Sequence, residues 1–177
     1  LNFLKILCLS ITFLFSLTIV CNIYCMGRMG DFINFRDISI RMGKNKEIIQ
    51  LSGGNTSIKD NKNLWIKASG KRLSMAESQP IFASIPLDPS MEDLHEIDKH
   101  IPENFSTDNL RPSIETSMHL YLPHKVILHS HPYNIIALSI STNAERLFSN
   151  YLPSYQWRII PYIQPGRQLG LAVKETY

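Results

Sequence analysis

The segment Val126-Ile127-Leu128-His129-Ser130-His131-Pro132 joins a short apolar run to two histidines and a proline. The apolar run predicts a buried strand, and Pro132 ends it because proline has no N–H to donate. Side chains two positions apart in a strand point to the same face, so His129 and His131 present two imidazoles side by side. Such a pair suits two ligands of a metal ion. The alternative is two partly exposed histidines at a strand end.

Glu115 precedes this strand, in the segment Pro112–Leu122. Proline is tolerated in a first helical turn, so the segment predicts a helix from Pro112 to Leu122 that leads into the histidine strand. A glutamate on that helix can fold back over the metal and transfer protons. The alternative is an ordinary solvated carboxylate, or one favoured by the dipole of the helix N-terminus.

Two turns rich in glycine and serine lie upstream, at Ser52–Ser57 and Lys67–Gly70. Glycine allows a close approach of the backbone, and exposed N–H groups suit an anion such as phosphate. Either turn alone is also typical of a plain hairpin or strand end. The pair therefore predicts an anion site only in combination with the histidines.

The remaining pattern alternates short strands with helices, which predicts a layered α/β domain. Helices are expected at residues 31–50, 91–100, 112–122, 133–139 and from 168 onward. Strands are expected around residue 58 and at 64–67, 81–87, 126–131 and 158–162, with a hairpin turn at 60–63. Asp31 is expected to cap the first helix.

The composition bounds the class of protein. The 177 residues fit one domain, and the net charge of +3 comes from scattered Lys and Arg, which argues against a nucleic-acid partner. All three cysteines lie in the first 25 residues, so the main domain has no disulfide framework. This suits a reducing compartment, and we expect a cytoplasmic protein.

Residues 1–25 differ from the rest, being almost wholly apolar. One interpretation is a translation start placed too early, with Met26 or Met29 as the true start. The alternative is a signal peptide or membrane anchor, because about 20 apolar residues span a bilayer as a helix. The expected organisation is an N-terminal segment, 1–25, and a domain, 26–177.

Together these segments resemble the class II aldolase/adducin family. The likeness extends from Ser52 to Val173 and lies in Ser52-Gly-Gly-Asn-Thr-Ser57, Leu64-Trp-Ile-Lys-Ala-Ser-Gly70, Pro112-Ser-Ile-Glu-Thr116, His129-Ser-His-Pro132, Pro161-Tyr162 and Pro165-Gly166. Within the family it is similar to the aldolase half of rhamnulose-phosphate aldolase/dehydrogenase-type proteins, through Arg111-Pro-Ser-Ile-Glu-Thr116, Leu122-Pro-His-Lys125 and Ile135-Ile-Ala-Leu138.

The resemblance implies a three-layer α/β/α domain with a central, mostly antiparallel sheet. It also implies a zinc ion, or another divalent metal, that polarises a ketose phosphate and stabilises its enediolate during cleavage to dihydroxyacetone phosphate and an aldehyde. His129 and His131 would then be metal ligands, and Glu115 the acid/base. The phosphate pocket would be lined by Gly54, Asn55, Ser69, Gly70 and Ser113. Ile114 stands where short aldolases of the family have a serine.

The family's third zinc histidine follows the Pro-Gly segment, whereas no histidine follows His131 here. The sequence therefore predicts a domain whose C-terminal part is missing and which holds zinc less tightly than three histidines would. A pentulose-phosphate 4-epimerase and an inactive remnant or adducin-like binding module are the alternative functions. The expected partners are a small sugar phosphate and, for the complete domain, further copies of the chain.

Overall fold

A six-stranded antiparallel sheet forms the centre of the protein in a computed structural model, which describes residues 4–9, 16–21, 28–87, 109–152 and 157–177. The strand order is β1-β2-β6-β3-β4-β5. The strands are β1 (Leu4–Leu9), β2 (Ser16–Cys21), β3 (Asn55–Lys59), β4 (Asn63–Lys67), β5 (Phe82–Pro86) and β6 (Val126–Ser130). Every pairing in it is antiparallel, as expected.

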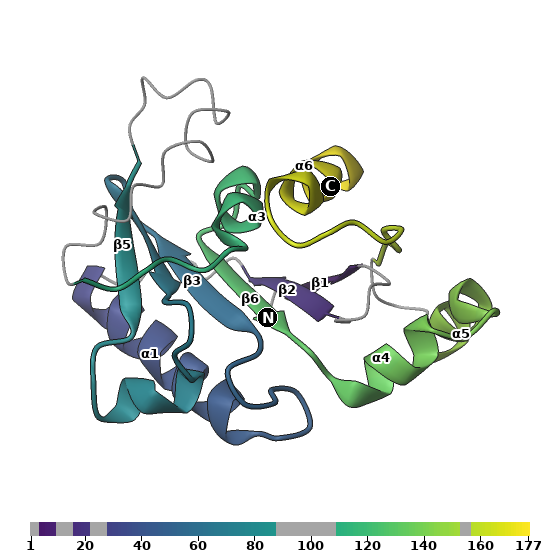
Figure 1. Ribbon diagram of the computed structural model, residues 1–177, viewed down its shortest axis with the longest axis horizontal. Helices are drawn as coiled ribbons and strands as arrows, with labels where there is room; N and C mark the ends of the chain where they lie inside the picture. Colours follow the sequence, from purple (N-terminus) through teal and green to yellow (C-terminus); the bar gives the residue numbers. More distant parts are fainter. Residues whose placement is uncertain (1–3, 10–15, 22–27, 88–108, 153–156) are drawn as a thin grey trace.

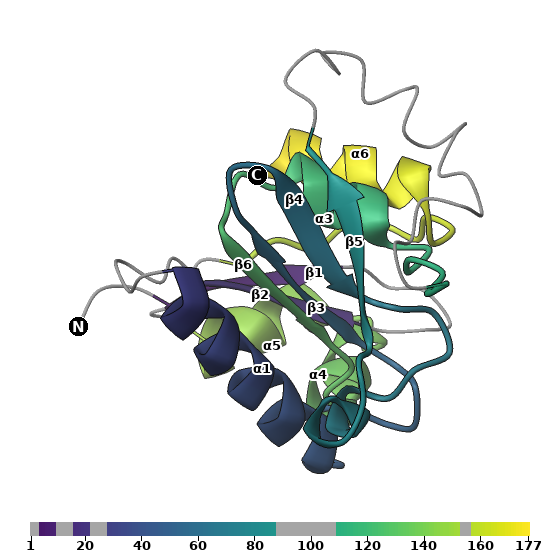
Figure 2. The same cartoon turned by 90° about the vertical axis from the view of Figure 1, so that its left-hand side faces the viewer.

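Helices cover both faces of this sheet, as Figures 1 and 2 show. One face carries α1 (Arg28–Lys44), α4 (Tyr133–Ser139) and α5 (Ala144–Tyr151). The other carries α3 (Thr116–Tyr121) and α6 (Arg167–Thr176). A short 3-10 helix, η1 (Leu73–Glu77), packs against α1. The expected three-layer α/β/α arrangement is confirmed.

The alternation of side chains along β6 divides the core between the two layers. Val126 packs in the cluster beneath α1, with Phe35 and Ile58. Ile127 packs on the opposite face, in the cluster of α3 and α6. Since His129 is two positions beyond Ile127, strand periodicity directs it to the α3 and α6 face, where the cavity described below lies.

The first helix differs from its prediction at both ends. It begins at Arg28 and stops at Lys44, instead of running from 31 to 50. Asn45 follows it, and its side-chain oxygen accepts a hydrogen bond from the N–H of Glu47 at 2.9 Å, which favours a turn over another helical turn. Asp31 is therefore inside the first turn and pairs with Lys125 instead of capping the start.

The helix expected at 112–122 begins only at Thr116. Pro112 forms an isolated bridge with Ala68 and is extended. The Ser113 carbonyl accepts from the N–H of Thr116 at 3.1 Å and starts the helix. Glu115 consequently lies just before α3 and not on its surface.

The strand expected at 158–162 does not form. Its Ile160 is buried in the cluster of α3 and α6, but Pro161 cannot donate to a neighbouring strand. The hairpin at 60–63, the strand near 81–87 and the helix at 133–139 are confirmed. Helices α5 and η1 were not predicted, and the helix expected at 91–100 lies outside the described residues.

The described part of residues 1–25 forms β1 and β2, which pair with each other, and β2 pairs with β6. Among the described residues, none of the helices has the length and apolar content needed to cross a lipid bilayer.

Candidate functional site

The two predicted metal ligands converge at the end of β6. The Nε2 atoms of His129 and His131 are 3.1 Å apart, and their rings are nearly perpendicular. Two imidazole nitrogens on a tetrahedral zinc lie about 3.3 Å apart, given Zn–N bonds of about 2.0–2.1 Å. The pair thus fits two positions of a metal site. Within the described ranges no group of three or more His, Cys, Asp or Glu side chains is arranged to hold a metal.

Glu115 faces this pair although it lies outside the helix. Its Oε1 is 3.2 Å from His129 Nε2, and its Oε2 accepts a hydrogen bond from the side-chain amide of Asn55. Burial alone would raise the pKa of Glu115. The charge and hydrogen bond of His129, with the charges of His119 and His131, outweigh burial and lower the pKa to about 2. Glu115 is therefore an ionised carboxylate at neutral pH.

The β3–β6 pairing brings the first turn to the histidines. Asn55 is the direct partner of His129 in that register. The preceding residue, Gly54, has a φ of 63°. A Cβ there would lie 2.7 Å from the carbonyl oxygen of His129 and 2.4 Å from Cδ1 of Ile49. Glycine is thus needed for the turn to approach the histidine strand so closely.

The second turn joins the same site through the chain before α3. The N–H of Ser69 donates to the carbonyl of Arg111 at 2.8 Å. Ser113 is two residues further on, and its hydroxyl accepts from the Asn55 amide at 3.3 Å. Gly70 has a φ of 74°, the left-handed region that favours glycine. Four segments that are distant in the sequence therefore meet here.

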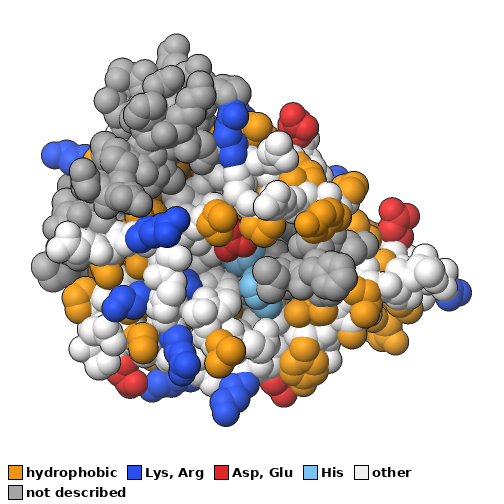
Figure 3. Space-filling model, in the orientation of Figure 1, with side chains coloured by type: hydrophobic (Ala, Val, Ile, Leu, Met, Phe, Trp, Pro, Cys, Tyr) orange, Lys and Arg blue, Asp and Glu red, His pale blue; other side chains and the backbone are white. Residues whose placement is uncertain are grey.

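These groups share one cavity of about 410 Å³. Figure 3 shows histidine and acidic side chains together in a hollow near the centre of this face. The cavity is lined by Ser52, Gly53, Gly54, Asn55, Lys67, Ser69, Gly70, Ser113, Ile114, Glu115, His131, Pro165 and Leu169. Every predicted site residue is among them except His129, which is fully buried behind Glu115 and His131.

Six lining residues were not predicted as site residues: Ser52, Gly53, Lys67, Ile114, Pro165 and Leu169. Ile114 had been noted only as a departure from the family pattern, and its side chain is 70% exposed at the cavity wall. Lys67 is the most significant omission because it is charged. The signal for it in the sequence was its place as the first residue of the second turn.

The other described histidines have structural partners. His119 is fully buried, and its Nδ1 is 2.6 Å from the hydroxyl of Ser57. His124 Nε2 is 2.9 Å from the hydroxyl of Tyr177. Both side chains therefore pack in the interior. His95 and His100 lie outside the described residues.

Buried His119 is expected to make the domain sensitive to acid. Burial first, and then the charges of His129 and Lys59, lower its pKa from 6.5 to about 3, although Glu115 opposes them. The unfolded chain takes up this proton below about pH 6.5 and the folded chain does not, so stability falls as the pH drops from 6.5 toward 3. Between pH 6.5 and 5 we expect a loss of about 2 kcal/mol in the free energy of unfolding.

Urea unfolding of chelator-treated protein at several pH values measures this loss. His119→Gln keeps a polar group beside Ser57 but does not titrate, so its stability should fall less steeply over the same interval. Equal slopes for the two proteins would show that His119 is not the group responsible.

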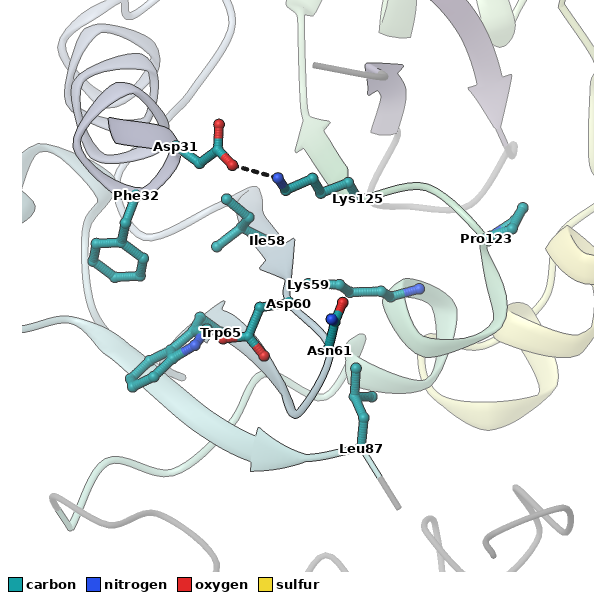
Figure 4. A pocket seen from close by; sticks show the side chains of 10 residues that line it. All are labelled: Asp31, Phe32, Ile58, Lys59, Asp60, Asn61, Trp65, Leu87, Pro123 and Lys125. Atoms are coloured by element: carbon teal, nitrogen blue, oxygen red, sulfur yellow. Dashed lines mark hydrogen bonds and ion pairs between the residues drawn. The ribbon is translucent and has the colours of Figure 1, made fainter. Parts of the chain in front are cut away.

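A second cavity, of about 450 Å³, lies at the other end of β3 and β6. Figure 4 shows Lys125 reaching Asp31 across one side of it. Lys59 donates to two carbonyls at the end of α3. Asp60 accepts from N–H groups of its own hairpin turn. These four charged groups already have partners, so the histidine cavity is the better candidate for binding a ligand.

Comparison with known proteins supports the fold described above. A solved structure described as the N-terminal class II aldolase domain of a conserved protein from Thermoplasma acidophilum superposes with a TM-score of 0.63. The identity is 24%, and the match covers 89% of this chain and 80% of that one. At that identity the likeness concerns the fold alone.

A sequence relative from Bacillus subtilis (strain 168), named "Uncharacterized oxidoreductase YuxG", is 28% identical over 156 residues. The match covers 76% of this chain but 22% of the relative, so the chain spans about a fifth of that protein's length. The sequence profile of the class II aldolase and adducin N-terminal domain matches residues 37–177. The chain therefore belongs to the class II aldolase and adducin N-terminal domain family.

Proposed function

We propose that this domain performs metal-dependent aldol cleavage of a ketose 1-phosphate, giving dihydroxyacetone phosphate and an aldehyde. The observation that supports this is the meeting of His129, His131 and Glu115 in one cavity with two glycine turns. The family match supports the same class of reaction as the geometry of the site. A purely structural domain has no need of two converging imidazoles beside an ionised carboxylate.

His129 and His131 would hold a divalent metal, whose Lewis acidity polarises the oxygens of a bound ketose. Their Nε2 atoms already converge without any rearrangement of the strand. The cavity is open beside His131, which lines it, while His129 is closed off from solvent. Substrate would therefore approach from the His131 side.

Glu115 is the group suited to move the proton. It is ionised, and its Oε2 is held by the Asn55 amide, so one carboxylate oxygen is fixed in place. A carboxylate held in this way can take the proton from the substrate hydroxyl on the carbon atom whose bond to its neighbouring carbon breaks. It can then return that proton to the carbanion that the cleavage leaves. Asn55 is thus a positioning residue for Glu115.

The substrate's phosphate would bind at the two turns. The backbone around Gly54 and Gly70 is in the left-handed conformation, and such turns present N–H groups to an anion. Ser69 and Ser113 line the same cavity. These polar groups supply hydrogen bonds, and the sugar chain would extend from them toward His131.

Cleavage assays on the purified 177-residue chain test this proposal. The chain is loaded with zinc, cobalt or manganese and supplied with a panel of ketose 1-phosphates. We expect metal-dependent release of dihydroxyacetone phosphate, which a chelator abolishes. Appearance of the 4-epimer of a pentulose phosphate without net cleavage would replace the aldolase by an epimerase. Failure to bind metal or to convert any of these substrates would overturn the proposal.

A further inference from the structure

Three polar residues of β3 face α3, and each of them bonds to the segment that contains this helix. Asn55, Ser57 and Lys59 are two positions apart, so strand alternation places them on one face of the sheet. The residues between them belong to the other face, where Thr56 bonds to α1 and Ile58 packs beneath it. The strand therefore presents a continuous polar row to the layer of α3 and α6.

The contacts of this polar row follow the chain in order. The Asn55 amide donates to Oε2 of Glu115 and to the hydroxyl of Ser113, just before α3. The hydroxyl of Ser57 is 2.6 Å from Nδ1 of His119, within the helix. Because the order of the contacts is the same in both segments, β3 and α3 run side by side in the same direction.

Lys59 completes the row at the carboxyl end of α3. Its Nζ donates to the carbonyl of Leu120 at 3.1 Å and to the carbonyl of Leu122. A cation is favoured at this end because the last carbonyls of a helix lack partners within the helix and carry partial negative charge. Burial lowers the pKa of Lys59 to about 8, so the ammonium group is still mainly protonated at neutral pH.

The other side of α3 packs through apolar contacts. Met118 and Leu122 lie in the cluster that α3 shares with α6. Apolar burial is non-directional, so it does not fix a helix of only six residues against sliding or rotation. Hydrogen bonds do fix it, because they weaken steeply with poor distance and angle. The polar row therefore sets the position of α3 along β3.

We propose that Ser57 and Lys59 act through α3 as positioning residues for Glu115. Glu115 immediately precedes the helix, and its Oε1 is 3.2 Å from His129 Nε2. A shift of α3 would therefore move the carboxylate relative to the histidine pair. The effect on catalysis rests on the proposed function, but the positioning can be measured without it. A displacement of about 1 Å can lower a rate by about 100-fold.

Kinetics of Lys59→Met, Lys59→Arg and the matched control Lys125→Met test the proposal. The Lys125 carbonyl accepts from the N–H of Lys59, but its ammonium group pairs with Asp31 of α1. In Lys59→Met, kcat should fall by about 10- to 100-fold, with KM and metal affinity within about threefold of wild type. Lys59→Arg keeps donors at the helix end, so its kcat should stay within about threefold of wild type, as should that of Lys125→Met. An equal loss in Lys59→Met and either of the other variants would overturn the proposal.

A second pair of variants tests the middle of the row. Ser57→Ala should lower kcat by about tenfold. Its control is Ser39→Ala, because Ser39 is also a buried hydroxyl beside β3 but bonds to Thr56 on the α1 face. Its kcat should equal that of the wild-type protein. If Lys59→Met does not fold, this pair decides, and equal kcat values for Ser57→Ala and Ser39→Ala would refute the proposal.

NMR separates this proposal from the aldolase itself. The contact between the Asn55 amide and Glu115 should give a nuclear Overhauser effect between the two side chains in the wild-type protein. The signal should weaken in Lys59→Met and Ser57→Ala and persist in Lys59→Arg. If the wild-type chain cleaves no ketose phosphate, the aldolase proposal fails while this signal still decides the positioning role. A signal that is unchanged in both weakened variants, or absent from the wild-type protein, contradicts the positioning role whatever the activity.

Discussion

Replacement of Glu115 by glutamine is expected to lower kcat for aldol cleavage by about 10²- to 10⁴-fold, the usual contribution of a positioned acid/base. Glutamine has nearly the same size and can still meet Asn55, but it cannot take up a proton near neutral pH. Metal content should remain at the wild-type level, because the imidazole pair is unchanged. Steady-state kinetics with a saturating divalent metal measure the loss.

The matched control is Glu145→Gln, which removes an exposed carboxylate from the first turn of α5. Its kcat should equal that of the wild-type protein. Loss of metal together with activity in Glu115→Gln would show that Glu115 acts mainly as a ligand. Retention of full activity would remove it from the proton-transfer role altogether.

Replacement of His131 by glutamine is expected to weaken divalent-metal binding by at least about 100-fold. The removed imidazole is one of two in the described site, and each ligand contributes several kcal/mol to a zinc site. His131 is preferable to His129 for this test because His129 is completely buried and its replacement also disturbs the core. Competition with a metal-sensitive dye gives the affinity directly.

His124→Gln is the control, since His124 is also buried but binds Tyr177 away from the cavity. Its metal affinity should remain within about threefold of the wild-type value, as for a change distant from the ligands. Equal weakening in both variants would point to loss of folding, and unfolding curves would reveal it. Unchanged affinity in His131→Gln would place the metal elsewhere.

The residues that the sequence predicted to lie together do so in the structure, whereas the ends of several helices differ from their predictions. His129 and His131 were placed by strand alternation, and alternation is a local property that the fold cannot easily alter. The two turns were recognised from glycine, whose backbone freedom is needed at Gly54 and Gly70. Their meeting in one cavity followed from the family resemblance, because no local pattern gives the β3–β6 pairing.

The errors arose where non-local contacts determine the structure. Pro112 is a common first helical residue, yet pairing with Ala68 holds it in an extended conformation. The position of the Lys67 ammonium group depends on two carbonyls, which lie fifteen residues before it and four residues after it. Neither contact has a signature in a single sequence. The helix α3 was therefore predicted to begin too early, and Lys67 was not predicted as a site residue.

The direct pairing of Asn55 with His129 has a consequence for folding. If β3 slipped by one residue along β6, Asn55 and Ser57 would turn to the opposite face of the sheet, and Thr56 and Ile58 would replace them. Such a misfolded chain would bury apolar Ile58 poorly and would also lose the amide that holds Glu115. Burial of Ile58 beneath α1 and the contact of Asn55 with Glu115 therefore depend on the same strand alignment, so a chain that folds with Ile58 in its native place also assembles this part of the site.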